Sequence, residues 1–340
     1  MYSHHSHSGD YIAHGSDPLD EIIARVYELN FHTYCLTEHM PRISQQYLYP
    51  EEYICNDVNK DLALLSENFE KYLKHASKIK NNACVDPYIR TSILIGMEVE
   101  GCDEEHLKLA NRILQQNSNV IQFVVGSCHH VNSVLIDFDA TSWMKALKET
   151  SNNNLRQLFK DYYNLQYKML TEIKPLVVGH FDLIRLYLPS TLRVNTNTGK
   201  VVTDQYSGGT PVSEIQNIMT YWEDVKELIV RNLKFIDSYG GCVEINTSGL
   251  RKNLIQPYPH IEVANLVKQY CSGRFVLSDD AHSVSQVGTN YSKALKYITN
   301  DLKLDYLYYL SDKNAIDHRI TVEKISIKDL VKDPFWSNDV

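Results

Sequence analysis

HSHSGDYIAHG, residues 5–15, places three histidines directly behind a short strand-like opening. In a β-strand, residues i and i+2 point to the same face, so His5 and His7 can direct both imidazoles at one metal ion. An isolated HxH pair is weak evidence, and MYSHHSHS even resembles a purification tag. His14 and similar residues later in the chain strengthen the interpretation of the pair as metal ligands.

Ligand-type residues recur along the chain, each time after a strand-like run. Seven of the fourteen histidines fall in these clusters. The clusters are His5-Ser6-His7, His14, Thr37-Glu38-His39, Gly96-Met97-Glu98, Gly126-Ser127-Cys128-His129, Gly179-His180-Phe181-Asp182 and Ser278-Asp279-Asp280-Ala281-His282. Placement of all of them at successive strand ends by chance is improbable. Imidazole and carboxylate ligands predict a multinuclear site for zinc, iron or manganese with hydrolytic chemistry.

Strand-like and helix-like segments alternate from end to end, which is typical of parallel βαβ construction. Asp17 as N-cap and Pro18 in the first turn predict a helix whose apolar positions run to Leu29. Further strands are expected at 31–36, 92–99, 120–125, 176–178, 241–245 and 275–277, and helices at 61–80, from 104, within 142–173 and 212–238, and at 261–270 and 285–299. About seven repeats predict an α/β barrel with its chemistry at the C-terminal ends of the strands.

The composition is that of an ordinary globular protein. The 340 residues are 43% hydrophobic and 22% charged, which provides ample material for a core. No apolar run approaches the roughly 20 residues that cross a bilayer, so we expect no membrane partner. The net charge of −8 argues against nucleic-acid binding. The seven cysteines contain no CxxC pair, which predicts reduced thiols. Together with an N-terminus that is too polar for a secretory signal, they predict a cytoplasmic location.

Two polar segments rich in turn-forming residues interrupt the alternation, at residues 40–57 and 189–211. Both follow a ligand-bearing strand, so they are expected to be loop insertions that either cover the site or lie on the surface. We find no internal repeat and no interdomain linker. The expectation is therefore a single domain over residues 1–340.

These motifs resemble the polymerase and histidinol phosphatase (PHP) superfamily, and within it the stand-alone histidinol-phosphate phosphatases, across essentially the whole chain. The matching pieces are HSHSGDYIAHG, LTEHMPR at 36–42, IGMEVE at 95–100, GSCHHVN at 126–132, VVGHFDLIRLY at 177–187, EINTSGLRK at 244–252 and LSDDAH at 277–282. The last four are specific to the phosphatase branch. The resemblance implies a distorted (β/α)7 barrel of PHP type that holds three divalent metal ions and hydrolyses L-histidinol phosphate in histidine biosynthesis.

The resemblance implies nine ligands for the three ions. The first ion takes His5, His7, Glu98 and Asp280. The second takes Glu98 as a bridging ligand, together with His129 and His180. The third takes His14, His39 and His282. Ser3 stands where many family members carry an acidic residue, so the group that orients His5 is left open.

The chemistry implied by these ions is attack by a metal-bridging hydroxide, because coordination lowers the pKa of water from about 15.7 toward 7. The hydroxide attacks phosphorus in line while metal–oxygen contacts neutralise the equatorial oxygens. Arg185, after GHFD, and Arg251, in TSGLRK, are candidate phosphate clamps, because guanidinium binds phosphate through two hydrogen bonds. The alternative for each is an ordinary surface arginine.

The sequence leaves the remaining roles open. The proton for the leaving alkoxide could come from Asp182, Asp279 or a ligand carboxylate. The cationic amine and the imidazole of the substrate need acceptors, for which the candidates are Glu38, Glu100 and Glu244. For each of these three, a solvated charge or a carboxylate that orients a metal ligand is an equal alternative.

Three competing functions were weighed. Residues 134–141, VLIDFDAT, match the DxDxT motif of haloacid-dehalogenase-type phosphatases, with Asp137 as nucleophile, but that interpretation leaves every histidine cluster unexplained. A PHP-like scaffold without chemistry is disfavoured because all nine ligands are present. A PHP-type nuclease is disfavoured by the acidic charge. Within the phosphatase interpretation, the alternative is another small phosphomonoester as substrate. The sequence does not give the metal identity or the oligomeric state.

Overall fold

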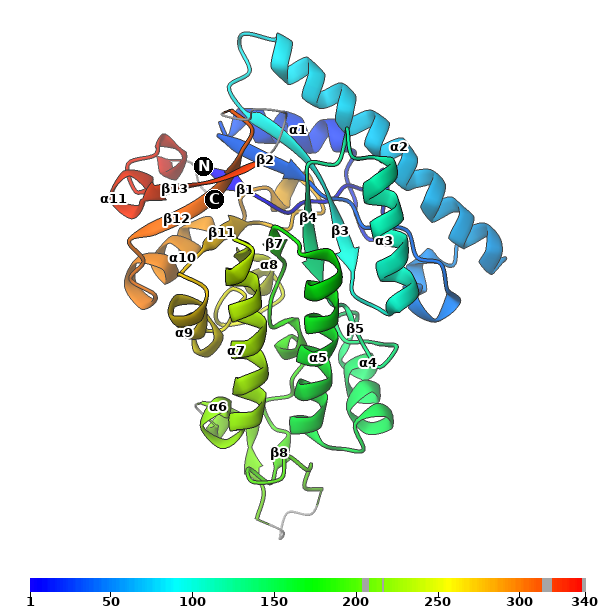
Figure 1. Cartoon of the computed structure of the whole chain (residues 1–340), viewed down its shortest axis with the longest axis vertical. Helices are drawn as coiled ribbons and strands as arrows, with labels where there is room; N and C mark the ends of the chain where they lie inside the picture. Colours follow the sequence, from blue (N-terminus) through cyan, green and yellow to red (C-terminus); the bar gives the residue numbers. More distant parts are fainter. Residues whose placement is uncertain (204–207, 216, 314–319, 338–340) are drawn as a thin grey trace.

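A sheet of seven parallel strands forms the centre of the computed structural model, which describes residues 1–203, 208–215, 217–313 and 320–337. In sheet order the strands are β1 (Tyr2–Ser3), β2 (Thr33–Leu36), β3 (Ser92–Glu100), β4 (Phe123–Ser127), β7 (Val177–Val178), β10 (Cys242–Asn246) and β11 (Phe275–Ser278). Beyond β1, the His7 N–H donates to the Ala281 carbonyl at 2.8 Å, and the Asp280 N–H donates to the His5 carbonyl at 3.1 Å. These bonds nearly close the sheet, and the predicted (β/α)7 barrel is confirmed (Figure 1).

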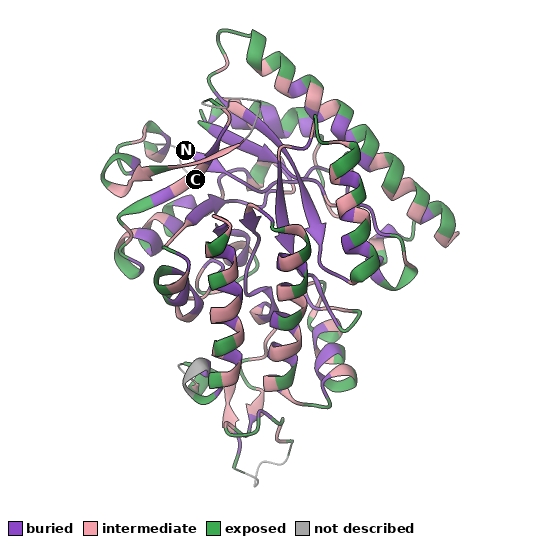
Figure 2. Cartoon of the chain, viewed as in Figure 1, coloured by how far each residue is buried: buried purple, intermediate pink, exposed green. Residues whose placement is uncertain are grey.

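Helices surround the sheet (Figure 1). They are α1 (Leu19–Glu28), α2 (Val58–Val85), α3 (Glu104–Gln116), α4 (Ala140–Lys145), α5 (Leu155–Ile173), α6 (Ile218–Tyr221), α7 (Glu223–Ser238), α8 (Ser248–Arg251), α9 (Ile261–Tyr270), α10 (Tyr291–Lys296) and α11 (Ile327–Leu330). Figure 2 shows buried strands and helices that are exposed on their outer side. No helix in the described part of the chain is long and apolar enough to cross a membrane.

The barrel interior has an apolar half and a polar half. The strand period of two shows which residues of each strand point into it. On β3, Ile93 and Ile95 belong to the core beneath the helices, whereas Leu94 belongs to a second cluster inside the barrel. Glu98 and Glu100 lie four and six residues after Leu94, so they point inward as well. The apolar half thus lies near the strand starts, and the charged half lies at the strand ends.

An antiparallel hairpin that the sequence reading did not predict closes the apolar end. It consists of β12 (Tyr306–Ser311) and β13 (Thr321–Ser326). Leu310 packs into the inner cluster, and its N–H donates to His4 Nε2 at 3.0 Å. The Nδ1–H of His4 in turn donates to the Leu277 carbonyl at 2.8 Å. His4 is therefore a packing residue.

Two local expectations are wrong. Asp17 does not cap α1, because Pro18 occupies the N-cap position and Asp10 Oδ2 accepts the Leu19 N–H at 2.8 Å. Asp17 instead accepts the Val284 N–H at 2.6 Å. The helix expected from residue 285 begins only at Tyr291, after a separate turn.

Two further pairs of short antiparallel strands lie outside the central sheet. They are β5 (His130–Val131) with β6 (Val134–Leu135), and β8 (Arg193–Val194) with β9 (Thr210–Pro211).

The inner apolar cluster should carry much of the stability of the barrel. Leu94 is fully buried, so Leu94→Ala leaves a cavity and should lower the free energy of unfolding by about 2–5 kcal/mol. Val85, which is 80% exposed, provides the control, and Val85→Ala should change this free energy by less than about 0.5 kcal/mol. Denaturant unfolding of both variants measures the difference, and equal stabilities would contradict the two-layer interior.

Candidate metal centre

The strand ends bring the predicted ligands together at the polar end of the barrel. His5 and His7 continue β1, and Glu98 lies near the end of β3. His39 follows β2 and forms a parallel bridge with Glu98. The remaining ligands follow the strands of the other half of the barrel or lie in the loop after β1: His129, His180, Asp280, His282 and His14.

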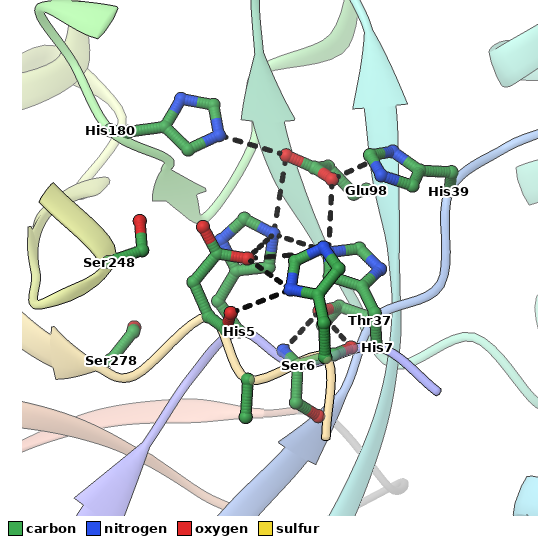
Figure 3. A network of polar contacts seen from close by, with 12 residues as sticks. His5, Ser6, His7, Thr37, His39, Glu98, His180, Ser248 and Ser278 are labelled. Carbon is green, nitrogen blue, oxygen red and sulfur yellow. Dashed lines mark hydrogen bonds and ion pairs between the residues drawn. The ribbon is translucent and has the colours of Figure 1, made fainter. Parts of the chain in front are cut away.

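The carboxylate of Glu98 is the centre of the cluster, as Figure 3 shows. Its Oε1 lies 3.2 Å from His5 Nε2 and 3.3 Å from His180 Nε2. Its Oε2 lies 2.9 Å from His39 Nδ1 and 3.3 Å from His7 Nε2. His129 Nε2 approaches Oε1 at 3.5 Å. A single carboxylate is thus surrounded by imidazole nitrogens from five different positions.

The outer nitrogens of several imidazoles are held by acceptors, which fixes the tautomer. The Nδ1–H of His5 donates to Glu244 Oε1 at 3.0 Å, and that of His129 donates to Glu100 Oε2 at 2.7 Å. The Nδ1–H of His282 donates to the Asp280 carbonyl at 2.8 Å. Because an acceptor at Nδ1 places the proton there, each Nε2 presents a lone pair to the centre.

This donor set fits divalent cations. The Nε2 atoms of His5 and His7 lie 3.0 Å apart, and those of His129 and His180 lie 3.2 Å apart, so unprotonated pairs would repel each other without a cation between them. Both oxygens of Glu98 are buried without a hydrogen-bond donor. Among the described residues, four triads that include predicted ligands have ligand-type atoms within 4.8 Å of one another: His5/His7/Asp280, His5/Glu98/His180, His7/His39/His282 and His39/Glu100/His129.

The electrostatics of the cluster point the same way. Burial raises the pKa of Glu98, but His5, His39 and His129 outweigh it and hold that pKa well below its ordinary value. Burial lowers the pKa of His5, but Glu98, Asp280 and Glu244 outweigh it and raise that pKa well above its ordinary value. The centre therefore keeps its carboxylates ionised and attracts positive charge, whether protons or metal ions.

A cavity of about 350 Å³ opens over the cluster. Eight of the nine predicted ligands and Arg251 line it, and so do residues that the sequence analysis did not assign to this site. The ligands are His7, His14, His39, Glu98, His129, His180, Asp280 and His282. The additional lining residues are Tyr49, Glu51, Asp137, Phe138, Tyr187, Lys252 and Gln286. Lys252 and Tyr187 end two of the family motifs, and Asp137 and Phe138 lie in VLIDFDAT, but no motif marks Tyr49, Glu51 or Gln286, whose loop positions depend on the completed barrel.

The comparisons with known proteins identify the family. A family model described as PHP domain matches residues 3–248. The chain belongs to the PHP domain family. Within this PHP family, the chain is similar to the histidinol-phosphatase of Saccharomyces cerevisiae, with 47% identity over 339 residues that cover 99% of this chain and 100% of the relative.

Two crystal structures share the PHP fold. One, from Listeria monocytogenes, has a TM-score of 0.60 and 20% identity, and the match covers 86% of this chain and 99% of the other. The second is histidinol phosphate phosphatase from Lactococcus lactis in complex with zinc, L-histidinol and phosphate. It has a TM-score of 0.52 and 15% identity, with coverage of 86% and 93%.

The three glutamates that were candidates to receive the substrate's amine or imidazole contact predicted metal ligands. Glu244 accepts from His5 and, through Oε2, from the His180 N–H at 2.8 Å. Glu100 accepts from His129 and from Arg42 Nη2 at 2.9 Å. Glu38 Oε2 lies 3.4 Å from His7 Nδ1. The alternative in which these carboxylates orient ligands is therefore the one that the PHP geometry favours, and Glu244 is the group that orients His5.

The two candidate arginines lie in different places. Arg251 lines the metal cavity and donates to the Asp279 and Asp280 carbonyls at 3.2 and 3.0 Å. The turn after β7 directs Arg185 elsewhere, because it donates to Glu262 at 2.6 Å and its Nε lies 3.3 Å from Asp182 Oδ2. Arg185 and Asp182 line a second cavity and not the metal cavity.

The structure also places Asp279, a candidate proton donor, and His14, a predicted ligand. Asp279 is buried, accepts from Ser3 Oγ and the Gly288 N–H at 2.8 Å each, and does not line the metal cavity. Burial raises its pKa to about 6. His14 lies in none of the four triads, although its ring centroid is 5.0 Å from that of His282 and 5.3 Å from that of His39. His14 is thus beside the third predicted ion site.

The VLIDFDAT segment does not have the geometry of a dehalogenase-type nucleophile strand. Val134 and Leu135 form a two-residue strand of the antiparallel β5–β6 hairpin. The carboxylate of Asp139, which would be the second acid of the motif, caps α4 by accepting the Ser142 N–H at 2.6 Å. Asp137 lines the metal cavity. The motif match is therefore incidental.

Glu98 should be the most sensitive ligand. Glu98→Gln replaces a shared anionic oxygen pair with a neutral amide, so both metal content and turnover should fall to near background. Glu105, a surface residue whose side chain is 64% exposed, gives the control Glu105→Gln, which should retain both. Metal analysis of the purified variants alongside phosphate release makes the measurement, and a Glu98→Gln variant with normal metal content would contradict the central position of Glu98.

Glu244 should act on metal binding without touching the metal. Glu244→Gln weakens the acceptor that fixes the tautomer of His5, so metal affinity should fall by about 10- to 100-fold. Competition with a chelator measures that affinity. The Glu38→Gln variant is a graded comparison, because the contact of Glu38 with His7 is longer, and its effect should be smaller. An equal or larger loss in Glu38→Gln would argue against the assignment of Glu244 to His5.

Proposed function

We propose that this PHP protein is a metal-dependent phosphomonoesterase that hydrolyses L-histidinol phosphate to L-histidinol and phosphate in histidine biosynthesis. The observation that carries the reaction type is the buried Glu98 carboxylate, whose two oxygens are surrounded by imidazole nitrogens beneath an open cavity. The substrate rests on the full-length similarity to the histidinol-phosphatase of Saccharomyces cerevisiae. A small-molecule site agrees with the size of the cavity.

We assign nine residues to three divalent ions. His5, His7, Glu98 and Asp280 hold the first ion, Glu98 is shared with the second ion at His129 and His180, and His14, His39 and His282 hold the third. Zinc, iron and manganese all suit these donors. Such ions, when bound, supply an activated water and neutralise charge on the phosphate.

The residues of the chain orient the ions and the substrate. Glu244 and Glu100 hold the outer nitrogens of His5 and His129, so that the inner nitrogens stay unprotonated. Arg251 holds the carbonyls beside Asp280 and lines the cavity, where its remaining N–H groups can bind phosphate oxygens. Lys252, next to it, adds a second positive charge.

We further propose that residues 1–340 form one PHP domain. The family match ends at residue 248, but Asp280 and His282 lie beyond that point, and β11 pairs with β10 inside the same sheet. The β12–β13 hairpin also fills the apolar end of the barrel. Neither the site nor the core is complete without the C-terminal part.

The cytoplasm is the compartment that the seven free cysteines favour.

The test of the substrate is a comparison of kcat/KM for L-histidinol phosphate with that for p-nitrophenyl phosphate and for a phosphodiester. We expect histidinol phosphate to be strongly preferred and the diester to be inert, with activity lost on exhaustive chelation and restored by added metal. The second readout is growth without histidine, which this protein should restore in a cell that cannot hydrolyse histidinol phosphate. Equal kcat/KM values for the two monoesters would point to another small phosphomonoester.

Arg251 and Arg185 should differ in their effect on phosphate binding. Arg251→Ala should raise the KM of any phosphomonoester by about tenfold or more, because a guanidinium that faces the phosphate is lost. Arg185→Ala should leave KM near the wild-type value and lower stability, since Arg185 pairs with Glu262 outside the metal cavity. Steady-state kinetics and thermal unfolding of both variants measure this contrast, and a raised KM in Arg185→Ala alone would reverse the assignment.

A further inference from the structure

One acidic side chain of the metal cavity is neither a predicted metal ligand nor, among the described residues, hydrogen-bonded to or ion-paired with one. Four acidic residues line the cavity. Glu98 and Asp280 are predicted ligands, and Glu51 Oε1 lies 3.7 Å from His14 Nδ1. Asp137, in the loop between β6 and α4, remains. Among the described residues, no lysine, arginine or histidine forms an ion pair with it.

Asp137 is held in place by a neutral donor. The hydroxyl of Tyr49 lies 3.0 Å from both Asp137 Oδ1 and Asp137 Oδ2, so the phenol centres on the carboxylate. Tyr49 is buried and comes from the 40–57 segment. A hydroxyl donor orients a carboxylate without placing a positive charge beside it, whereas a lysine partner would add one.

Aromatic residues line the same cavity as Asp137. The ring of Phe138, which is 36% exposed, lies 6.4 Å from the ring of Tyr49. The hydroxyl of Tyr187 donates to the Phe138 carbonyl at 3.0 Å and brings a third ring to the cavity wall. Such a wall suits a planar apolar group and also favours a cation, because the ring faces carry partial negative charge.

The cavity thus has two kinds of lining. Metal ligands, Arg251 and Lys252 supply a region that attracts an anion, and Asp137 with its aromatic neighbours supplies a region that attracts a cation. A phosphate ester with a positively charged amine fits such a cavity in one orientation only. The ammonium group would be repelled by the metal ions and by Arg251, so it requires an ionised acceptor elsewhere.

We infer that Asp137, positioned by Tyr49, is the specificity-determining carboxylate that pairs with the ammonium group of the substrate. This inference rests on the proposed function, because it names the group of the protein that recognises the organic part of a cationic phosphomonoester. It also gives the segment 134–141 a role that differs from that of a nucleophile. Tyr49 acts as a positioning residue, and its segment contributes a wall of the site.

The experiment compares L-histidinol phosphate with its desamino ester, 3-(imidazol-4-yl)propyl phosphate, which differs only in the absent amine. The selectivity is the ratio of the two kcat/KM values. Asp137→Asn should lower this ratio by about tenfold or more, mainly through KM for histidinol phosphate. Tyr49→Phe keeps the ring and removes the hydroxyl, so it should lower the ratio by a smaller factor.

The matched control is Asp139→Asn. This substitution removes one negative charge two residues away, outside the cavity lining, and asparagine caps a helix as well as aspartate does. Its ratio should equal the wild-type ratio. Metal content is measured in every variant, so that a change in the ratio is separated from a loss of metal.

The possible results separate the two proposals. Wild-type enzyme that fails to hydrolyse histidinol phosphate contradicts the proposed function. Wild-type enzyme that hydrolyses both esters at equal kcat/KM, or an Asp137→Asn variant that loses the same factor on both esters, overturns the role of Asp137 and leaves the phosphatase intact. A ratio lowered as much in Asp139→Asn as in Asp137→Asn would show a general effect of charge and would also overturn it.

Discussion

The buried carboxylate of Glu98 is the constraint on which the rest of the structure depends. An isolated ionised group in a protein interior costs several kcal/mol, so the surrounding side chains must supply positive charge or hydrogen bonds. In this barrel, the surroundings are imidazoles, and those of His5 and His129 already have their outer nitrogens held by other acceptors. The lone pairs that remain face one another across the carboxylate, an arrangement that is stable only with cations among them.

The apolar half and the polar half of the barrel interior meet directly beneath that carboxylate. Gly96 lies two residues before Glu98, on the same inward face of β3. A Cβ atom at Gly96 would lie 2.7 Å from the Phe123 ring and 3.0 Å from Thr37 Cγ2. The absence of a side chain therefore lets the aromatic ring lie directly beneath the charged layer. Close packing in the apolar half gives the strand ends a fixed spacing, which a multinuclear site requires.

The sequence predicted that these residues gather at one end of the barrel because most of them lie at the end of a strand or shortly after it, and the strand period determines which residues point inward. Their role as metal ligands stays a prediction. The contacts between strands could not be read in this way. The Glu244 carboxylate reaches His5 across 239 positions of sequence, and both residues must be in place before the contact exists. Asp137 and Tyr49 meet across 88 positions and come from two loops. The pairing of β12 with β13 is not predicted because these strands follow the last strand–helix repeat.

The segment 40–57 joins the substrate side of the cavity to the metal side. Arg42 is buried and donates through Nη1 to Glu52 at 2.7 Å and through Nη2 to Glu100 at 2.9 Å. Glu52 Oε2 accepts the Tyr49 N–H at 2.8 Å, and Glu100 accepts from His129. One guanidinium thus connects the residue that positions Asp137 with the residue that orients a metal ligand. Because a buried ion-pair network is strongly destabilised when one member is removed, the wall of the cavity and the metal centre form a single unit, and this loop is part of the site.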